Sequence, residues 1–254
     1  MWKKMSEERG ACQCPLLLLP LSAYICNTKS LYDNDNLSAD IKTYLDAIKF
    51  PTGISKISIF EKEARMGKNY TPISILKRSA DTERERLESL FQEMIYKILG
   101  ATEGTRSAIY QPISELVTNI FEHSKSDEGF VFSQFYPNKN YLDICIIDCG
   151  RGLPGSYKEE KGLSLSDGEA LIEVMNGHST KANKERGFGV RTSKDVVCRG
   201  LGGEFIMLSG SAVVISNEKE EKMVNLPDFS WHGVVIAYRI PKPTGPIDIY
   251  QYLE

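Results

Sequence analysis

The chain has 254 residues, with 31 basic and 34 acidic side chains and a formal net charge of −3. This length fits one large domain or two small ones, and 41% apolar with 26% charged residues is typical of a globular protein. That composition excludes a disordered chain and a coiled-coil rod. A slightly acidic chain lacks the basic surface that binds a phosphate backbone, which disfavours nucleic acid as a partner.

The sequence gives no sign of a membrane span. No apolar run approaches the ~20 residues that cross a bilayer, and the longest, 16–21, is interrupted by Pro20. Six scattered cysteines in a chain long enough to bury a core are typical of reduced thiols, so we expect a cytoplasmic protein. Cys12, Cys14 and Cys26 lack the spacing of a standard zinc finger, and zinc there is only an alternative.

The periodic signals become clearer near residue 80, which predicts a small N-terminal α/β segment, 1–80, followed by a main domain, 81–254. The sequence does not indicate a role for the first segment. Within the first segment, the apolar run 16–25 indicates a buried strand. Residues 37–48 carry apolar side chains at helical spacing, and 54–60 alternates in the manner of a strand.

The main domain begins with two predicted helices. Thr82-x-x-Glu85 is a capping-box pattern, an apolar stripe follows, and Gly100 is a natural stop. The second helix covers 112–123, with Pro112 in its first turn or at a kink if the helix begins earlier. The later predictions are strands at 129–135 and 141–147, a short helix at 167–176, a helix from Phe188 to about Arg199, and strands at 203–208, 212–216 and 233–240. This order favours an α/β (α+β) two-layer sandwich, a mixed and largely antiparallel sheet covered on one face by helices.

The second helix carries three polar residues in one stripe. Glu115, Asn119 and His123 follow one another at four-residue intervals, beside the apolar stripe. An amide oxygen is a ligand suited to Mg²⁺, and a carboxylate one turn away can deprotonate an attacking hydroxyl or water. The alternative is the solvated face of an amphipathic helix.

An aspartate ends the apolar strand 141–147. Alternation places Asp148 on the face where the helices are expected, so this carboxylate needs a partner. With Gly150 and Gly152 behind it, Asp148 suits recognition of an exocyclic amine such as that of adenine. The alternative is a loop aspartate with turn glycines.

The stretch Gly150 to Gly155 also matches a dinucleotide-binding pattern. That pattern must open a helix. Residues 156–162 show no helical apolar period, which argues against a dinucleotide site.

A third cluster combines glycines, hydroxyls and cations ahead of a helix. The stretches Gly177-His178-Ser179-Thr180-Lys181 and Arg186-Gly187-Phe188-Gly189-Val190 lead into the helix from Phe188. Such a helix start suits an anion. The pattern of a P-loop occurs nowhere in the sequence.

Taken in order over roughly residues 80–240, these three clusters resemble the GHKL ATPase family, which includes DNA gyrase and the histidine kinases. The stretch "ELVTNIFEHS" looks most like the asparagine box of the anti-sigma-factor serine kinases and histidine-kinase ATPase domains. The stretches "DCGRGLP" and "RGFGV" look like the two glycine boxes.

The resemblance implies ATP and Mg²⁺ as ligands and a role for each motif residue. Asn119 would hold Mg²⁺, Glu115 would be the general base, and Asp148 would read the adenine amino group. Gly150 and Gly152 would shape the adenine pocket.

The resemblance also implies that residues 153–186 form a mobile ATP lid. The implied nucleotide contacts are His123, Thr180, Lys181, Gly187, Phe188, Gly189 and Val190. Two departures stand out: Gly233-Val234 replaces the usual Gly-Thr pair, and the second glycine box has two glycines instead of three.

The histidine positions exclude a complete sensor kinase, because all three lie inside the ATPase-like region. We therefore expect an Mg-ATP-binding regulatory protein, an ATP-dependent serine/threonine protein kinase or ATPase that acts on a regulatory protein partner. The alternative is a nucleotide-gated protein-interaction module with little or no turnover. A third interpretation, a structural protein, requires all three clusters to be accidental. Relatives often dimerise, so a homodimer is a further expectation, although the sequence reveals no interface.

Overall fold

One sheet organises the protein. The computed structural model describes residues 14–64, 67–100, 103–178 and 189–252, and within them seven strands pair in the order β1-β2-β3-β7-β4-β5-β6. The strands are β1 (Ser74–Lys77), β2 (Glu128–Tyr136), β3 (Tyr141–Asp148), β4 (Glu204–Gly210), β5 (Ala212–Asn217), β6 (Glu221–Asn225) and β7 (Trp231–Pro241). The sheet was predicted to be mixed and largely antiparallel; each pair of neighbouring strands is in fact antiparallel.

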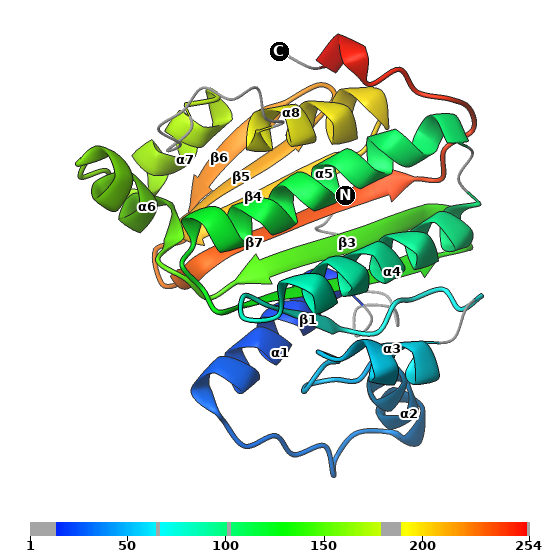
Figure 1. Ribbon diagram of the computed structural model, residues 1–254. Helices are drawn as coiled ribbons and strands as arrows, with labels where there is room; N and C mark the ends of the chain where they lie inside the picture. Colours follow the sequence, from blue (N-terminus) through cyan, green and yellow to red (C-terminus); the bar gives the residue numbers. More distant parts are fainter. Residues whose placement is uncertain (1–13, 65–66, 101–102, 179–188, 253–254) are drawn as a thin grey trace.

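Helices α4, α5 and α8 lie side by side over one face of this sheet, which confirms the two-layer α/β sandwich (Figure 1). The helices are α1 (Pro15–Thr28), α2 (Ala39–Ala47), α3 (Ile57–Glu63), α4 (Asp81–Leu99), α5 (Glu103–His123), α6 (Gly152–Lys161), α7 (Asp167–Met175) and α8 (Val190–Asp195). A π-helical turn, Val196–Gly200, continues α8, and a 3₁₀ turn, Tyr250–Tyr252, lies near the C-terminus.

The alternating side chains of β3 divide the interior into two cores. Leu142, Ile144 and Ile146 pack into the core beneath α4 and α5. Cys145 and Ile147 point to the opposite face and pack with residues of α1. Asp148 follows the first set by alternation, so its side chain lies on the face covered by α4 and α5, as predicted.

Two strand predictions in the first 80 residues are wrong. The run 16–25 lies in helix α1, which buries one side against the sheet. A short apolar run cannot be distinguished from a buried helix by periodicity alone, and Pro15 at a first-turn position favours the helix. The run 54–60 enters helix α3, whose first amide, of Ile57, donates to Glu83 Oε1 at 3.0 Å. A contact distant in sequence therefore stabilises the start of α3.

The segment before residue 80 also supplies a strand of the main sheet. β1 pairs with β2, from Ser74 opposite Val131 to Lys77 opposite Glu128. On the far side of β1, Ile54 forms a bridge to Ser74. This end of the sheet is therefore covered by a neighbouring length of chain.

Most predictions after residue 80 are confirmed, with two omissions and one error: α4 is capped by Ala80 with no side-chain cap, so the capping box at Thr82 is wrong. Helix α5 includes Pro112 in its interior and begins at Glu103. The stretch 156–162, predicted to be non-helical, lies largely within α6, which buries Tyr157. Strand β6 was not predicted, because its five residues are all exposed and leave no apolar alternation to detect.

The dinucleotide pattern does open a helix, because α6 begins at Gly152. A dinucleotide fold, however, needs parallel strands joined by a crossover helix. β3, which precedes α6, pairs antiparallel with both of its neighbours. The rejection of a dinucleotide site stands, but for this topological reason.

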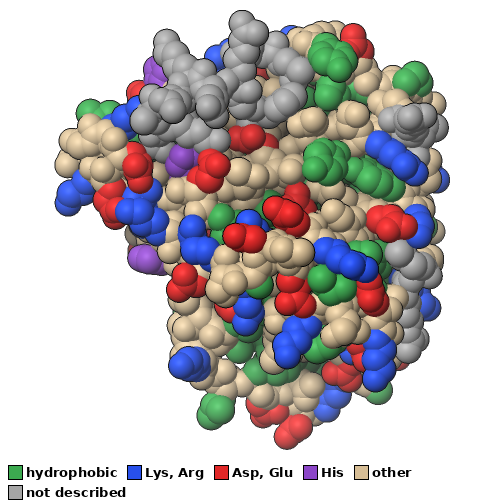
Figure 2. Space-filling model, viewed as in Figure 1, with side chains coloured by type: hydrophobic (Ala, Val, Ile, Leu, Met, Phe, Trp, Pro, Cys, Tyr) green, Lys and Arg blue, Asp and Glu red, His purple; other side chains and the backbone are tan. Residues whose placement is uncertain are grey.

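None of the described helices combines the length and the apolarity needed to cross a bilayer. On the face seen in Figure 2, Lys and Arg side chains are interspersed with Asp and Glu side chains. This mixture of charges agrees with the low net charge.

Candidate functional site

Asp148 is a buried carboxylate at the end of β3, with 3% of its surface exposed. Its Oδ1 accepts a hydrogen bond from the Gly150 amide at 2.8 Å, and the backbone amide of Val234 also donates to the carboxylate. Burial raises the pKa of Asp148 to about 7, although these two amides favour the charged form and oppose the shift. Asp148 is therefore poised to change charge near neutral pH.

Val234 is the residue that replaces the expected threonine. It lies opposite Asp148 in the pairing of β3 with β7, so its amide supplies a donor where a hydroxyl was expected. The preceding Gly233 has a φ of +123°, and a Cβ there would lie 2.2 Å from the carbonyl oxygen of Asp148. A glycine is required at this close approach.

The loop after Asp148 is held against the C-terminal end of α5. A Cβ on Gly150 would lie 2.2 Å from the Ser124 carbonyl oxygen, so only glycine fits. The Arg151 amide donates to that same oxygen at 2.9 Å, and Arg151 Nε donates to the His123 carbonyl at 2.7 Å. These bonds satisfy carbonyl groups that the end of a helix leaves unpaired.

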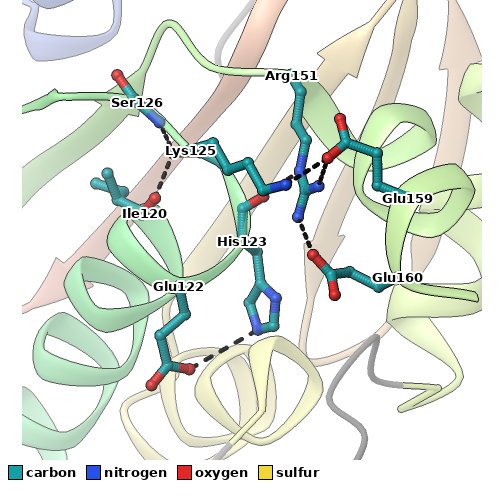
Figure 3. A network of polar contacts seen from close by, with 9 residues as sticks. Ile120, Glu122, His123, Lys125, Ser126, Arg151, Glu159 and Glu160 are labelled. Atoms are coloured by element: carbon teal, nitrogen blue, oxygen red, sulfur yellow. Dashed lines mark hydrogen bonds and ion pairs between the residues drawn. The ribbon is translucent and has the colours of Figure 1, made fainter.

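Arg151 also joins this loop to α6 (Figure 3). Its Nη1 lies 2.6 Å from Glu159 Oε2, and its Nη2 lies 2.7 Å from Glu160 Oε1. Lys125 forms a second ion pair with Glu159. One guanidinium thus connects the end of α5, the strand end that bears Asp148, and α6.

Glu115 and Asn119 lie together on α5. Asn119 Nδ2 donates to Glu115 Oε1 at 3.3 Å, and both side chains are half-buried. Phe121 lies toward α4, because the Arg84 guanidinium of α4 sits 4.5 Å from its ring centroid. Helical geometry then places Glu115 and Asn119 on the other edge of α5, toward α8, which contacts α5.

His123 ends α5 on the same stripe. Its Nε2 lies 3.9 Å from Glu122 Oε2, and its ring points to the same side as the Arg151 guanidinium in Figure 3. The structure therefore brings His123 beside the loop that follows Asp148.

Only part of the third cluster can be placed. Gly189 is the N-cap of α8, and Val190 begins that helix and packs against the core. Arg191 Nη1 approaches the Asn176 carbonyl at 3.5 Å, so the start of α8 lies beside the end of α7. Four predicted contacts lie outside the described residues: Thr180, Lys181, Gly187 and Phe188.

The Asn119 side chain suits a magnesium ion whose other ligands are phosphate oxygens and water. The Asn119 amide bonds Glu115 through its nitrogen, so this hydrogen bond does not use its oxygen Oδ1. Mg²⁺ typically takes one or two protein ligands together with phosphate oxygens and water. Within the described ranges, no three His, Cys, Asp or Glu side chains form a cluster that could enclose a metal.

Two buried serines near this site were not predicted. Ser209 Oγ accepts the Leu153 amide of α6 at 3.0 Å, and Ser209 pairs with Val234 in the sheet. Ser193 of α8 is buried, and its Oγ has no partner among the described residues. The alternation of β4 could have revealed Ser209, since it ends an apolar strand face as Asp148 does.

Comparison with known proteins adds no assignment to this geometry. No family model matches the sequence, and no curated protein matches it significantly.

Because Asp148 is buried, we expect the free energy of unfolding to fall as the pH rises. Its folded pKa of about 7 lies above the unfolded value of ~3.9, so the folded state holds the proton more tightly. We expect a loss of up to about 4 kcal/mol between about pH 4 and pH 7, with no further loss above. Urea denaturation at several pH values measures it.

The Asp148→Asn variant cannot ionise at this position, so it should lose this part of the dependence of the unfolding free energy on pH. Glu88, whose pKa burial also raises to about 7, contributes with the same sign. Glu88→Gln is therefore the matched control and should remove a separate part. An Asp148→Asn slope equal to that of the wild type would contradict the assignment.

Gly150→Ala should destabilise the protein, because the new Cβ would overlap the Ser124 carbonyl. We expect a loss of about 1–3 kcal/mol, as for other overpacked sites. Gly189→Ala is the control, since Gly189 has a φ of −79° and no atom within 4 Å of the added Cβ. Equal unfolding free energies for the two variants would show that the contact with α5 is unimportant.

Proposed function

We propose that this chain is an Mg-ATP-binding regulatory protein of the GHKL type, cytoplasmic, and an ATP-dependent serine/threonine protein kinase or ATPase that acts on a protein partner. One observation carries the proposal. The buried Asp148 lies at a strand end beside the helix that bears Glu115 and Asn119. Free thiols at the described cysteines support a reducing compartment.

In this proposal Asp148 recognises the base. A buried carboxylate that already accepts two backbone amides has lone pairs left for one further donor, and the exocyclic amine of adenine is such a donor. The amine would also favour the charged carboxylate, which burial alone disfavours. A purine with an acceptor at that position would set an oxygen against the carboxylate and add no hydrogen bond, so adenine is preferred.

In this proposal Glu115 and Asn119 have different roles at the phosphates. Asn119 Oδ1 would hold Mg²⁺, which would supply charge neutralisation at the phosphates when bound. Glu115 accepts the proton of the attacking hydroxyl, from a partner's serine or threonine or from water. The hydrogen bond from Asn119 Nδ2, at 3.3 Å, orients the Glu115 carboxylate for this step.

A nucleotide-gated interaction module is the second candidate, and the Arg151 network favours it. The loop after Asp148 is joined through Arg151 to Glu159 and Glu160 of α6. A ligand that contacts Asp148 therefore also acts on the position of α6, with or without turnover.

Calorimetric titration with ATP and Mg²⁺ tests the site. We expect the wild-type chain to bind, and Asp148→Asn to weaken binding by about 10- to 100-fold, since hydrogen bonds to charged groups contribute about 1.5–3 kcal/mol. Asn119→Ala should bind ATP with little dependence on Mg²⁺. Asp127→Asn, which changes an exposed carboxylate just before β2, is the control. Equal affinities in all four proteins would refute the site.

Turnover distinguishes the two candidates. If Glu115 is the base, Glu115→Gln should slow phosphate release or transfer from labelled ATP by roughly 10²–10⁴-fold while ATP still binds. Glu93→Gln, at an exposed position of α4, should leave the rate unchanged. A wild-type chain that binds Mg-ATP without release or transfer would favour the interaction module.

A further inference from the structure

The two edges of the sheet differ in how they are covered. At β1, the Ile54 amide donates to the Ile73 carbonyl at 2.9 Å, and the Ile75 amide donates to the Ile54 carbonyl at 2.8 Å. At the other edge, the five residues of β6 are all exposed. Among the described residues, β6 pairs with β5 alone (Figure 1).

The backbone groups that β6 presents to this open edge follow from its register. The Asn217 amide donates to the Glu220 carbonyl at 2.9 Å, and the Leu226 amide donates to the Ser211 carbonyl at 2.8 Å. Because antiparallel pairs alternate between bonded and non-bonded positions, Lys222 and Val224 direct their backbone groups toward β5. Glu221, Met223 and Asn225 therefore direct their N–H and C=O groups outward.

We propose that β6 pairs antiparallel with β6 of a second copy of this chain, with Met223 opposite Met223. In this register the three outward-facing residues of one copy meet those of the other, Glu221 opposite Asn225. The N–H and C=O groups of each pair then bond reciprocally. Lys222 lies opposite Val224, so no like charges face each other.

Neighbouring registers are less favourable. A shift of two residues in one direction places Lys222 opposite itself, and like charges directly opposite are destabilising. The same shift in the other direction places Glu221 opposite Pro227, which has no N–H to donate. A shift of one residue sets outward-facing groups against inward-facing ones.

The side chains of β6 are also compatible with antiparallel pairing to β6 of a second copy. Met223 and Val224 are 44% and 43% exposed, and pairing would cover both. The Glu221 carboxylate is already held by Lys194 Nζ at 2.6 Å and Ser216 Oγ at 2.9 Å, so its charge is compensated within one copy. Lys222 is similarly paired with Glu220 at 2.8 Å. The open edge thus presents backbone groups and apolar side chains that are complementary to themselves.

The two-fold axis of this pairing is perpendicular to the sheet. A continuous sheet would cross both copies, and the helical layers of α4, α5 and α8 would lie on the same side of it. Both sites that contain Asp148 would then open on one face of the dimer.

Sedimentation equilibrium of the full chain tests the proposal with a charge exchange at the self-paired position. We expect the wild-type chain to form a dimer. Samples are loaded at up to about 1 mM, so that a dimer with a Kd as weak as about 1 mM is still detected. Met223→Lys and Met223→Glu should each dissociate at least about tenfold more readily, because position 223 then faces a like charge. An equal mixture of the two variants should recover the dimer.

Ile59→Lys and Ile59→Glu are matched controls, because Ile59 is 45% exposed on α3, which packs on α4 near β1, at the opposite edge of the sheet from β6. Neither should change the equilibrium. Met223→Pro removes one outward N–H without removing a bond to β5, and it should also favour the monomer. Circular dichroism melts verify that each variant is folded.

A monomeric wild-type chain would overturn the proposal. So would a dimer that Met223→Lys, Met223→Glu and Met223→Pro leave intact, because the contact would then lie elsewhere. Two monomeric charge variants whose mixture stays monomeric would overturn the register.

Discussion

The close approach of the Asp148 loop to the end of α5 is the constraint on which the site depends. Gly150 allows the contact, since any Cβ would overlap the Ser124 carbonyl. Arg151 then uses its amide and its Nε to bond the last carbonyls of the helix. The helix that bears Glu115 and the strand that bears Asp148 are thereby fixed relative to each other, although 29 residues of sequence separate Asp148 from Asn119.

The electrostatics of Asp148 follow from this packing. The carboxylate is removed from water, and its hydrogen-bond donors are the backbone amides of Gly150 and Val234 rather than a cation. Two amides compensate only part of the cost of burying a charge, which is why the pKa of Asp148 rises to about 7. A neutral donor from a ligand can complete this hydrogen bonding, whereas a ligand that offers only acceptors cannot.

Sequence reasoning predicted the parts of this arrangement that depend on short-range periodicity. The four-residue spacing of Glu115 and Asn119 and the alternation that carries Asp148 are local properties, and both hold in the structure. The main errors concern elements decided by distant contacts. Helix α3 begins where Glu83 caps it, and α1 is helical where its composition fitted a strand equally well. The backbone donor of Val234 could not be predicted, because an amide leaves no signal in residue type.

The role of the glycines illustrates the same limit. As motif residues, Gly150 and Gly152 suggest open space for a ligand, yet a Cβ at Gly152 would already lie 3.2 Å from Ser209 Oγ. Because these glycines lack a Cβ, the end of α5 and the end of β4 can pack closely against this loop. Any ligand at Asp148 therefore meets a loop whose position is determined by α5, by β4 and, through Arg151, by α6. Its selectivity comes from the donors and acceptors that this loop presents, and any shift of the loop must carry α6 with it through Arg151.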